Sequence, residues 1–169
     1  MTFESCLPYI LKEEGGFIDH PEDPGGATNH GITRKTWETF TGKKATIDDI
    51  KKLTISDVTP AYKKLYWDKV RGDELPLGVN LAVFDFAVNS GPTTAIRHLQ
   101  KVADVEADGI FGPDTKREVW AMDANQLIFD LCQSRYLFLH SLDHFPTFGR
   151  GWTSRISRIL SASLSLRLN

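Results

Sequence analysis

The sequence predicts a mainly α-helical protein, a helical bundle with one small β or irregular element near its N-terminus. Two observations predict this class. Glycine and proline crowd the segment from residue 15 to residue 31, which must therefore form turns and short strands. After this segment, hydrophobic residues recur at helical spacing almost to the C-terminus. The 169 residues, of which 41% are hydrophobic, are enough for one domain or for one domain with a small subdomain.

The first helix is expected to end at Glu14. Leu7 and Ile10 follow the spacing of one apolar helix face, and Glu14 falls on the same face. Pro8 should lie in the first turn of this helix, and Gly15-Gly16 should end it.

A glutamate in this place is a candidate general acid. Apolar surroundings and the negative end of the helix dipole both disfavour the ionised form of Glu14. A carboxyl that stays protonated near neutral pH can give its proton to the leaving oxygen of a glycosidic bond. The alternative is a solvated glutamate at an ordinary helix end.

Further helices are expected along the rest of the chain. Their predicted ranges are 53–70, 77–89, 94–105, 113–122, 123–142 and about 151–166. Pro60 should lie in the first turn of the 53–70 helix. Asp85 lies within the apolar 77–89 helix, and we expect it to be a structural anchor because buried polar groups need partners.

Charge and motif content exclude several classes of function. The net charge of −2 does not supply the basic surface of a general nucleic-acid binder. The most apolar stretch, Leu75–Val88, is short and contains Asp85, so it does not predict a membrane span. Cys6 and Cys132 form no CxxC pair, and buried free thiols are expected. Because HExxH and GxSxG motifs do not occur either, we expect no metal and no cofactor.

One long run carries a family resemblance. From Glu14 to Thr33 the chain reads EGGFIDHPEDPGGATNHGIT, which resembles the signature of the glycoside hydrolase family 108 lysozymes, N-acetylmuramidases common in bacteriophages and prophages. Tyr66-Trp67-Asp68, Phe84–Gly91 and Phe148–Trp152 look like later landmarks of that family. The resemblance implies an α+β lysozyme-like fold and a peptidoglycan hydrolase that cleaves between N-acetylmuramic acid and N-acetylglucosamine. It also implies that Glu14 is the catalytic acid.

Two further residues are candidates for the catalytic machinery. Asp23 is the best candidate for a second carboxylate, because proline and glycine turns around it can fold the loop back toward the helix end. The order Glu14, Asp23, Thr28 also resembles that of other phage lysozymes, although its last interval differs, and makes Thr28 a candidate for holding a water molecule. Asp23 before Pro24 is alternatively an ordinary turn residue.

Four residues are candidates for substrate binding: His30, Thr33, Tyr66 and Asn89. His30 and Thr33 lie where the loop rejoins the helical body, and their side chains can hydrogen-bond sugar hydroxyl or N-acetyl groups. Thr33 before Arg34 is also a typical helix N-cap. Tyr66 can stack on a sugar face or pack in the core. Asn89 ends a buried helix and is a candidate for lining a cleft.

Residues 99–119 carry a second resemblance. They resemble the core of a peptidoglycan-binding module, in which a helix ending in Leu-Gln precedes a turn like that of Asp108–Thr115. We therefore expect residues 1–92 to be the catalytic region and residues 93–169 a peptidoglycan-binding-like helical region fused into the same globule. The turn can equally serve to join two core helices.

The C-terminal part bears on partners and location. From Ser134 to Asn169 there are five arginines and one acidic residue, Asp143, so the last helix can make weak contact with anionic envelope surfaces. Docking of this helix on the core, with solvated arginines, is the commoner outcome. We expect a monomer whose partner is the glycan strand. Because Met1–Glu4 does not resemble an export signal, we expect synthesis in the host cytoplasm and holin-type release to the wall.

Two other functions stay open from the sequence. A lytic transglycosylase also needs one acid/base glutamate, but leaves anhydro ends in place of reducing ends. A peptidoglycan-binding protein without activity is the second alternative, and it depends on the Asp108–Thr115 turn. The sequence does not distinguish an inverting from a retaining mechanism, because that depends on the separation of two carboxylates.

Overall fold

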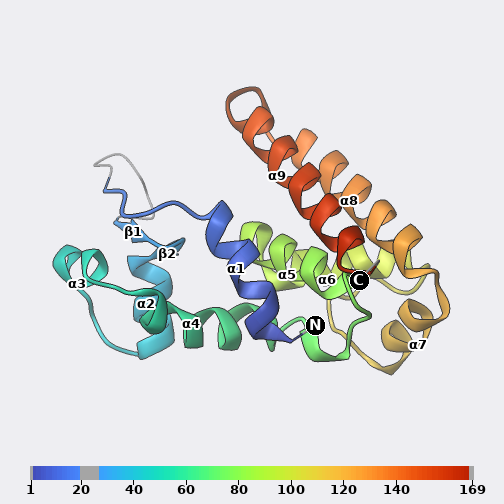
Figure 1. Ribbon diagram of the computed structural model, residues 1–169, viewed down its shortest axis with the longest axis horizontal. Helices are drawn as coiled ribbons and strands as arrows, with labels where there is room; N and C mark the ends of the chain where they lie inside the picture. The colour runs from blue at the N-terminus through green and yellow to red at the C-terminus, as the bar shows by residue number, and fades with distance from the viewer. Residues whose placement is uncertain (1, 20–26, 168–169) are drawn as a thin grey trace. The chain divides into compact units, whose positions relative to one another are not determined.

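The structure, a computed structural model, describes residues 2–19 and 27–167. The chain divides into two compact units: Glu4–Leu65 form one, and residues from Tyr66 onward, with Phe3, form the other. Helices make up most of both units, and the strands of the described residues form one small antiparallel sheet (Figure 1). The mainly α-helical class, with a small β element near the N-terminus, is therefore confirmed.

The Glu4–Leu65 unit contains short helices around a two-stranded hairpin. Its elements are α1 (Phe3–Glu13), β1 (Thr28–Asn29), β2 (Ile32–Thr33), α2 (Arg34–Thr41), α3 (Ile47–Lys51) and α4 (Ile55–Tyr62). Thr46 and Thr54 begin α3 and α4 with capping boxes, in which each threonine pairs with an aspartate three residues later. Of α2 and α3, only the start of α2 is predicted from the sequence, through the N-cap at Thr33.

Two prolines lie deeper in helices than expected. α1 begins at Phe3, so Pro8 is in its middle, and the capping box at Thr54 starts α4 well before Pro60. Both prolines are exposed, so water can replace the hydrogen bond that each removes. The expected continuous 53–70 helix is also wrong, because α4 gives way to a π-helical turn, Lys63–Trp67.

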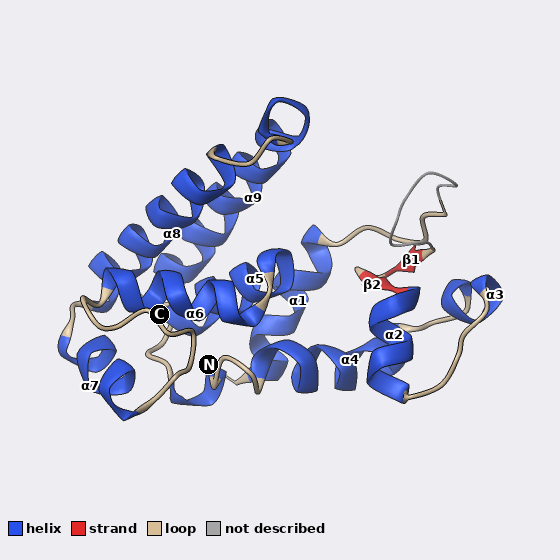
Figure 2. Cartoon of the chain, turned by 180° about the vertical axis from the view of Figure 1, so that it is seen from behind, coloured by secondary structure: helices blue, strands red, loops and turns tan. Residues whose placement is uncertain are grey.

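The second unit is built around one buried helix. Its elements are a 3₁₀ turn (Gly72–Glu74), α5 (Val79–Ser90), α6 (Pro92–Val102), α7 (Pro113–Ala121), α8 (Ala124–His140) and α9 (Phe145–Ser165). The residues from Val79 to Ala87 are all buried, and α5 packs against α6, α8 and α9 (Figure 2). This burial explains why the 77–89 segment is apolar throughout.

The last helix begins earlier than expected. It starts at Phe145, whereas the sequence predicts a start near residue 151, and it contains Gly149 and Gly151. A Cβ atom at Gly149 would lie 2.8 Å from the Phe145 ring. Glycine is therefore required where the ring packs closely on the helix backbone, and here it does not mark a helix end.

Asp85 is the anchor that the sequence predicts. Its carboxylate is fully buried and accepts hydrogen bonds from Arg135 Nη1 on α8, at 2.6 Å, and from Arg155 Nη2 on α9, at 2.8 Å. Burial alone would raise the pKa of Asp85, but the charges of the two guanidinium groups outweigh it and hold the pKa below its usual range. One side chain thus ties α5 to α8 and α9.

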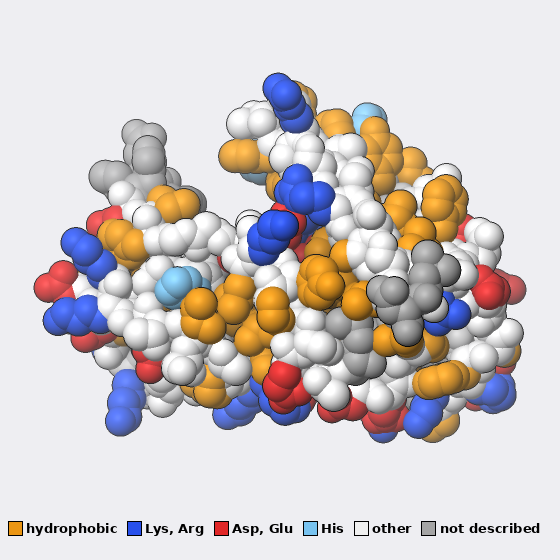
Figure 3. All heavy atoms as spheres, in the orientation of Figure 1, with side chains coloured by type: hydrophobic (Ala, Val, Ile, Leu, Met, Phe, Trp, Pro, Cys, Tyr) orange, Lys and Arg blue, Asp and Glu red, His pale blue; other side chains and the backbone are white. Residues whose placement is uncertain are grey.

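These ion pairs correct part of the expected envelope contact. Arg135 and Arg155 are buried against Asp85, so they do not face an external surface. Arg150 and Arg158 are exposed, and Figure 3 shows hydrophobic side chains exposed along the helix pair α8 and α9. Contact of this helix pair with an anionic envelope stays a prediction.

Cys6 and Cys132 are both buried, and they do not form a disulfide with each other, as expected. Burial raises the pKa of the Cys132 thiol to about 11, so it is neutral at physiological pH. In residues 2–19 and 27–167, histidine, cysteine, aspartate and glutamate form no group of three that suits a metal ion. Within the same ranges, no helix has both the length and the apolar character of a membrane span.

Replacing Asp85 by asparagine should lower stability by about 3–5 kcal/mol, because it leaves two buried guanidinium charges without their counter-ion. The matched control is D143N, at an exposed aspartate outside this cluster. Since the folded pKa of Asp85 is lowered, the advantage of the wild type is complete well above the unfolded value of about 3.9. This advantage in stability should shrink as the pH falls toward and through the lowered pKa of Asp85 in the folded state. Urea unfolding measured between pH 3 and pH 7 checks this, and equal stability of D85N and D143N at pH 7 would contradict it.

Candidate active site

Glu14 lies directly after the last residue of α1. Its backbone N–H donates to the Ile10 carbonyl at 3.1 Å, so it still takes part in the helical bonding pattern. Its side chain is half-buried. The helix thus ends at Glu13, one residue before the end that the sequence predicts, and Glu14 lies between it and Gly15-Gly16.

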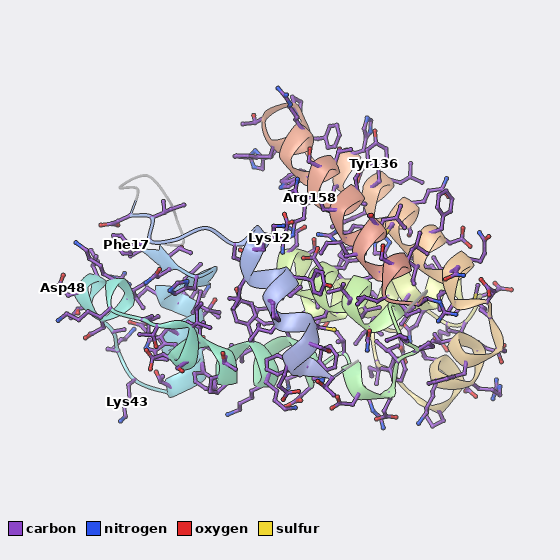
Figure 4. All side chains as sticks on the ribbon, in the orientation of Figure 1. Lys12, Phe17, Lys43, Asp48, Tyr136 and Arg158 are labelled. Carbon is purple, nitrogen blue, oxygen red and sulfur yellow. The ribbon has the colours of Figure 1, made fainter. Side chains whose placement is uncertain are left out.

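The segment after Glu14 is tied back to the hairpin. Ile18 and Thr28 exchange two backbone hydrogen bonds of 2.8 Å, which form an antiparallel bridge. Phe17, labelled in Figure 4, lies under the ammonium group of Lys51, with 5.7 Å between Nζ and the ring centroid. These contacts hold Phe17 and Ile18 in place, just before residues 20–26. Residues 20–26 lie outside the described residues.

The hairpin makes a tight turn at His30 and Gly31. Strand pairing places Thr28 opposite Thr33 and Asn29 opposite Ile32. The two turn residues have φ values of 46° and 74°, both in the left-handed region. Such a two-residue turn suits the twist of a β-hairpin and favours glycine.

The turn packs directly against Glu14. A Cβ atom built on Gly31 would overlap the Tyr62 hydroxyl and lie 2.7 Å from Glu14 Cγ and from Glu14 Oε2. No side chain larger than a hydrogen atom fits at this position without displacing one of them. The hairpin turn, the Glu14 carboxyl and the end of α4 therefore meet at one point.

Asn29 holds the hairpin from its other side. Its side chain is buried, and Nδ2 donates to the carbonyl oxygens of Ile50, Lys51 and Leu53 at 3.0 to 3.2 Å. These carbonyls lie at the end of α3, where a helix leaves acceptors without intrahelical partners. Asn29 could not be identified from local sequence patterns, because its partners lie more than 20 residues away along the chain.

Thr33 is the N-cap of α2, as the sequence analysis allows. Its hydroxyl oxygen accepts a hydrogen bond from the backbone N–H of Thr36 at 3.1 Å and lies 2.9 Å from the Thr36 hydroxyl. The hydroxyl thus has a structural function at the start of the helix. Its contact with substrate stays a prediction.

The other predicted site residues have different positions. Thr28 and His30 lie on the hairpin, and both are half-buried. Asp23 lies outside the described residues. Tyr66 and Asn89 belong to the second unit, where Tyr66 is in the π-helical turn and Asn89 is near the end of α5. The roles predicted for all five stay predictions.

The Asp108–Thr115 turn is braced by a buried glutamine. Gln100 Nε2 donates to Asp108 Oδ1, to the Ile110 carbonyl and to Thr115 Oγ1, while its Oε1 accepts from Gly109 N–H. The Ile110 N–H and the Gln100 amide hold the pKa of Asp108 below its usual range. These hydrogen bonds account for an architectural role of the turn. Of the residues that make them, Gln100, Asp108, Ile110 and Thr115 also line a hollow of about 430 Å³. Wall binding by residues 93–169 stays a prediction.

Comparison with known proteins identifies the family. The model of the family described as glycosyl hydrolase 108 matches residues 7–91, which include the whole run from Glu14 to Thr33. The chain belongs to glycosyl hydrolase family 108. The resemblance found in the sequence is therefore confirmed, although the match ends before the 99–119 segment.

A solved structure is similar to nearly the full chain. The structure of Brucella abortus SagA is 46% identical in sequence and covers 97% of this chain and 94% of its own, with a TM-score of 0.91. None of the curated protein sequences compared with the chain matched it. As a member of family 108, the chain is a glycoside hydrolase, a peptidoglycan hydrolase of the lysozyme type.

The contact of Asn29 with α3 should matter for both stability and activity. Replacing Asn29 by alanine removes the side-chain donor to the Lys51 and Leu53 carbonyls, whereas the Ile50 carbonyl keeps the Leu53 N–H. This loss should cost about 1–3 kcal/mol. Because the hairpin carries the turn against Glu14, hydrolysis of cell walls should also fall in N29A. Thermal unfolding and wall turbidity measure the two effects, with N125A, at an exposed asparagine of α8, as the control. Wild-type values of both in N29A would show that the anchor is unimportant.

Proposed function

We propose that this enzyme is an endolysin-type N-acetylmuramidase that uses Glu14 as its general acid. The bond cleaved joins N-acetylmuramic acid to N-acetylglucosamine in the glycan strands of peptidoglycan. The observation that carries the proposal is the position of the Glu14 carboxyl, which lies at the end of α1 in contact with the hairpin turn. It is also the glutamate of the Glu-Gly-Gly motif by which the chain resembles its family.

In this proposal Glu14 gives its proton to the glycosidic oxygen as the bond to the anomeric carbon breaks. The anomeric carbon then carries positive charge, which a carboxylate can stabilise. Asp23 is the candidate for that carboxylate, and Thr28 is the candidate for holding the attacking water. The hydroxyl of this water adds to the anomeric carbon and completes hydrolysis. The remaining proton of the water restores the protonated Glu14 carboxyl.

Replacing Glu14 by glutamine should lower hydrolysis of purified sacculi by about a hundredfold or more, because the amide cannot donate an acidic proton. Glu13 is the matched control, since E13Q changes the neighbouring carboxyl and should keep most of the activity. Mass spectrometry of the soluble fragments identifies the reaction. Reducing N-acetylmuramic acid ends support hydrolysis.

Two outcomes would contradict the proposal. Anhydro ends, which are lighter by one water molecule, would identify a lytic transglycosylase. Unchanged activity of a folded E14Q variant would exclude Glu14 as the acid. Unfolding curves of E14Q and E13Q, measured beside the wild type, show that both variants are folded.

Host cell lysis is the biological role that we propose for this activity, with release to the wall through a holin-type opening. Cells that express the wild type should remain turbid until their inner membrane is permeabilised, and should then lyse. Cells that express E14Q at the same level should not lyse after the same treatment. Equal lysis of the two cultures would contradict the role.

A further inference from the structure

Tyr62 is a residue of the site that neither the motif nor the family resemblance singles out. It is the last residue of α4, and its side chain is fully buried. Its hydroxyl donates a hydrogen bond to the carbonyl oxygen of His30 at 2.9 Å, across 32 residues of chain. The hydroxyl therefore fixes the peptide that connects His30 to Gly31 in the hairpin turn.

The Tyr62 hydroxyl is also a neighbour of the Glu14 carboxyl. The Tyr62 oxygen and Glu14 Oε2 both lie within 3.0 Å of one point, the position that a Cβ atom of Gly31 would occupy. Gly31 leaves this point empty, and its φ of +74° is a conformation that disfavours other residues. At this point only the hydrogen atoms of Gly31 have to fit between the turn, the Tyr62 hydroxyl and the Glu14 carboxyl.

The direction of the His30 hydrogen bond determines what Tyr62 can offer to Glu14. A phenol has one proton, and here the His30 carbonyl takes it. Only lone pairs of the Tyr62 oxygen then remain for other partners. A protonated carboxyl can donate to a lone pair, whereas an ionised carboxylate has no proton to donate.

We propose that Tyr62 is a positioning residue for the reaction: its hydroxyl holds the hairpin turn on Glu14 and presents an acceptor to the protonated Glu14 carboxyl. This proposal rests on the proposed function, in which Glu14 is the general acid. Gly31 is the complementary part of the arrangement, because its missing side chain allows the hydroxyl and the carboxyl to approach. Because the Tyr62 side chain is fully buried, we expect its effect in the chemical step and not in substrate binding.

Y62F tests the proposal, because it removes the hydroxyl and keeps the ring. The substrate is a soluble glycan of alternating N-acetylglucosamine and N-acetylmuramic acid, on which kcat and KM can be separated. We expect kcat to fall at least tenfold and KM to change less than twofold. The alkaline limb of the pH profile of kcat should also move to lower pH, because the protonated carboxyl loses an acceptor.

Y136F is the matched control, since Tyr136 lies on α8 in the other unit with its side chain partly exposed (Figure 4). It should behave as the wild type. Thermal unfolding and pelleting with sacculi show whether Y62F is folded and still binds. A folded Y62F with wild-type kcat and pH profile would overturn the proposal, as would a loss of kcat with no change in the pH profile.

The E14Q experiment separates this proposal from the one on which it rests. If E14Q is inactive and Y62F is like the wild type, only the role of Tyr62 fails. If E14Q is active, the proposed function fails and the role of Tyr62 fails with it.

Discussion

The candidate site depends on one steric constraint, the close packing of the hairpin turn at Gly31 against the Glu14 carboxyl. At a solvent-exposed helix end a glutamate side chain populates many rotamers, and restricting it to one costs conformational entropy. Here a turn without a side chain lies against the carboxyl, and the Tyr62 hydroxyl occupies the adjoining position. The hairpin is itself fixed by the bridge to Ile18 and by Asn29 at the end of α3. Several contacts, each modest in energy, thus define the position of one acidic group.

The second unit uses a different kind of interaction. Asp85 and its two arginines replace hydrophobic packing at the centre of α5, where burial of an unpaired charge would be strongly unfavourable. Such a cluster contributes little net stability compared with apolar side chains, but removal of one partner is costly. We therefore expect the cluster to act by favouring one arrangement of α5, α8 and α9 over others. The arginines of the C-terminal part are divided between this buried function and the surface.

Local signals in the sequence predicted local features. Thr33 caps α2, and an aspartate in an apolar run is an anchor, both as expected. The end of α1 was predicted to within one residue, because the helix stops at Glu13, just before Glu14 and the glycine pair. The partners of that aspartate could not be predicted, because Arg135 and Arg155 are 50 and 70 residues away. Tyr62 and Asn29 escaped notice for the same reason. Local rules also failed where the surroundings overrode them, as at exposed Pro60 inside α4 and at Gly149 beneath the Phe145 ring.

The most direct test of the central claim changes the leaving group of the substrate. A disaccharide with a 2,4-dinitrophenyl leaving group needs no proton, because the phenolate departs unaided, whereas the natural sugar alcohol needs one. If Glu14 is the general acid, E14Q should turn over the dinitrophenyl glycoside within about tenfold of the wild-type rate while losing about a hundredfold or more on the natural glycan. Equal losses of activity on the two substrates would contradict the account, because they would assign Glu14 a role other than proton donation.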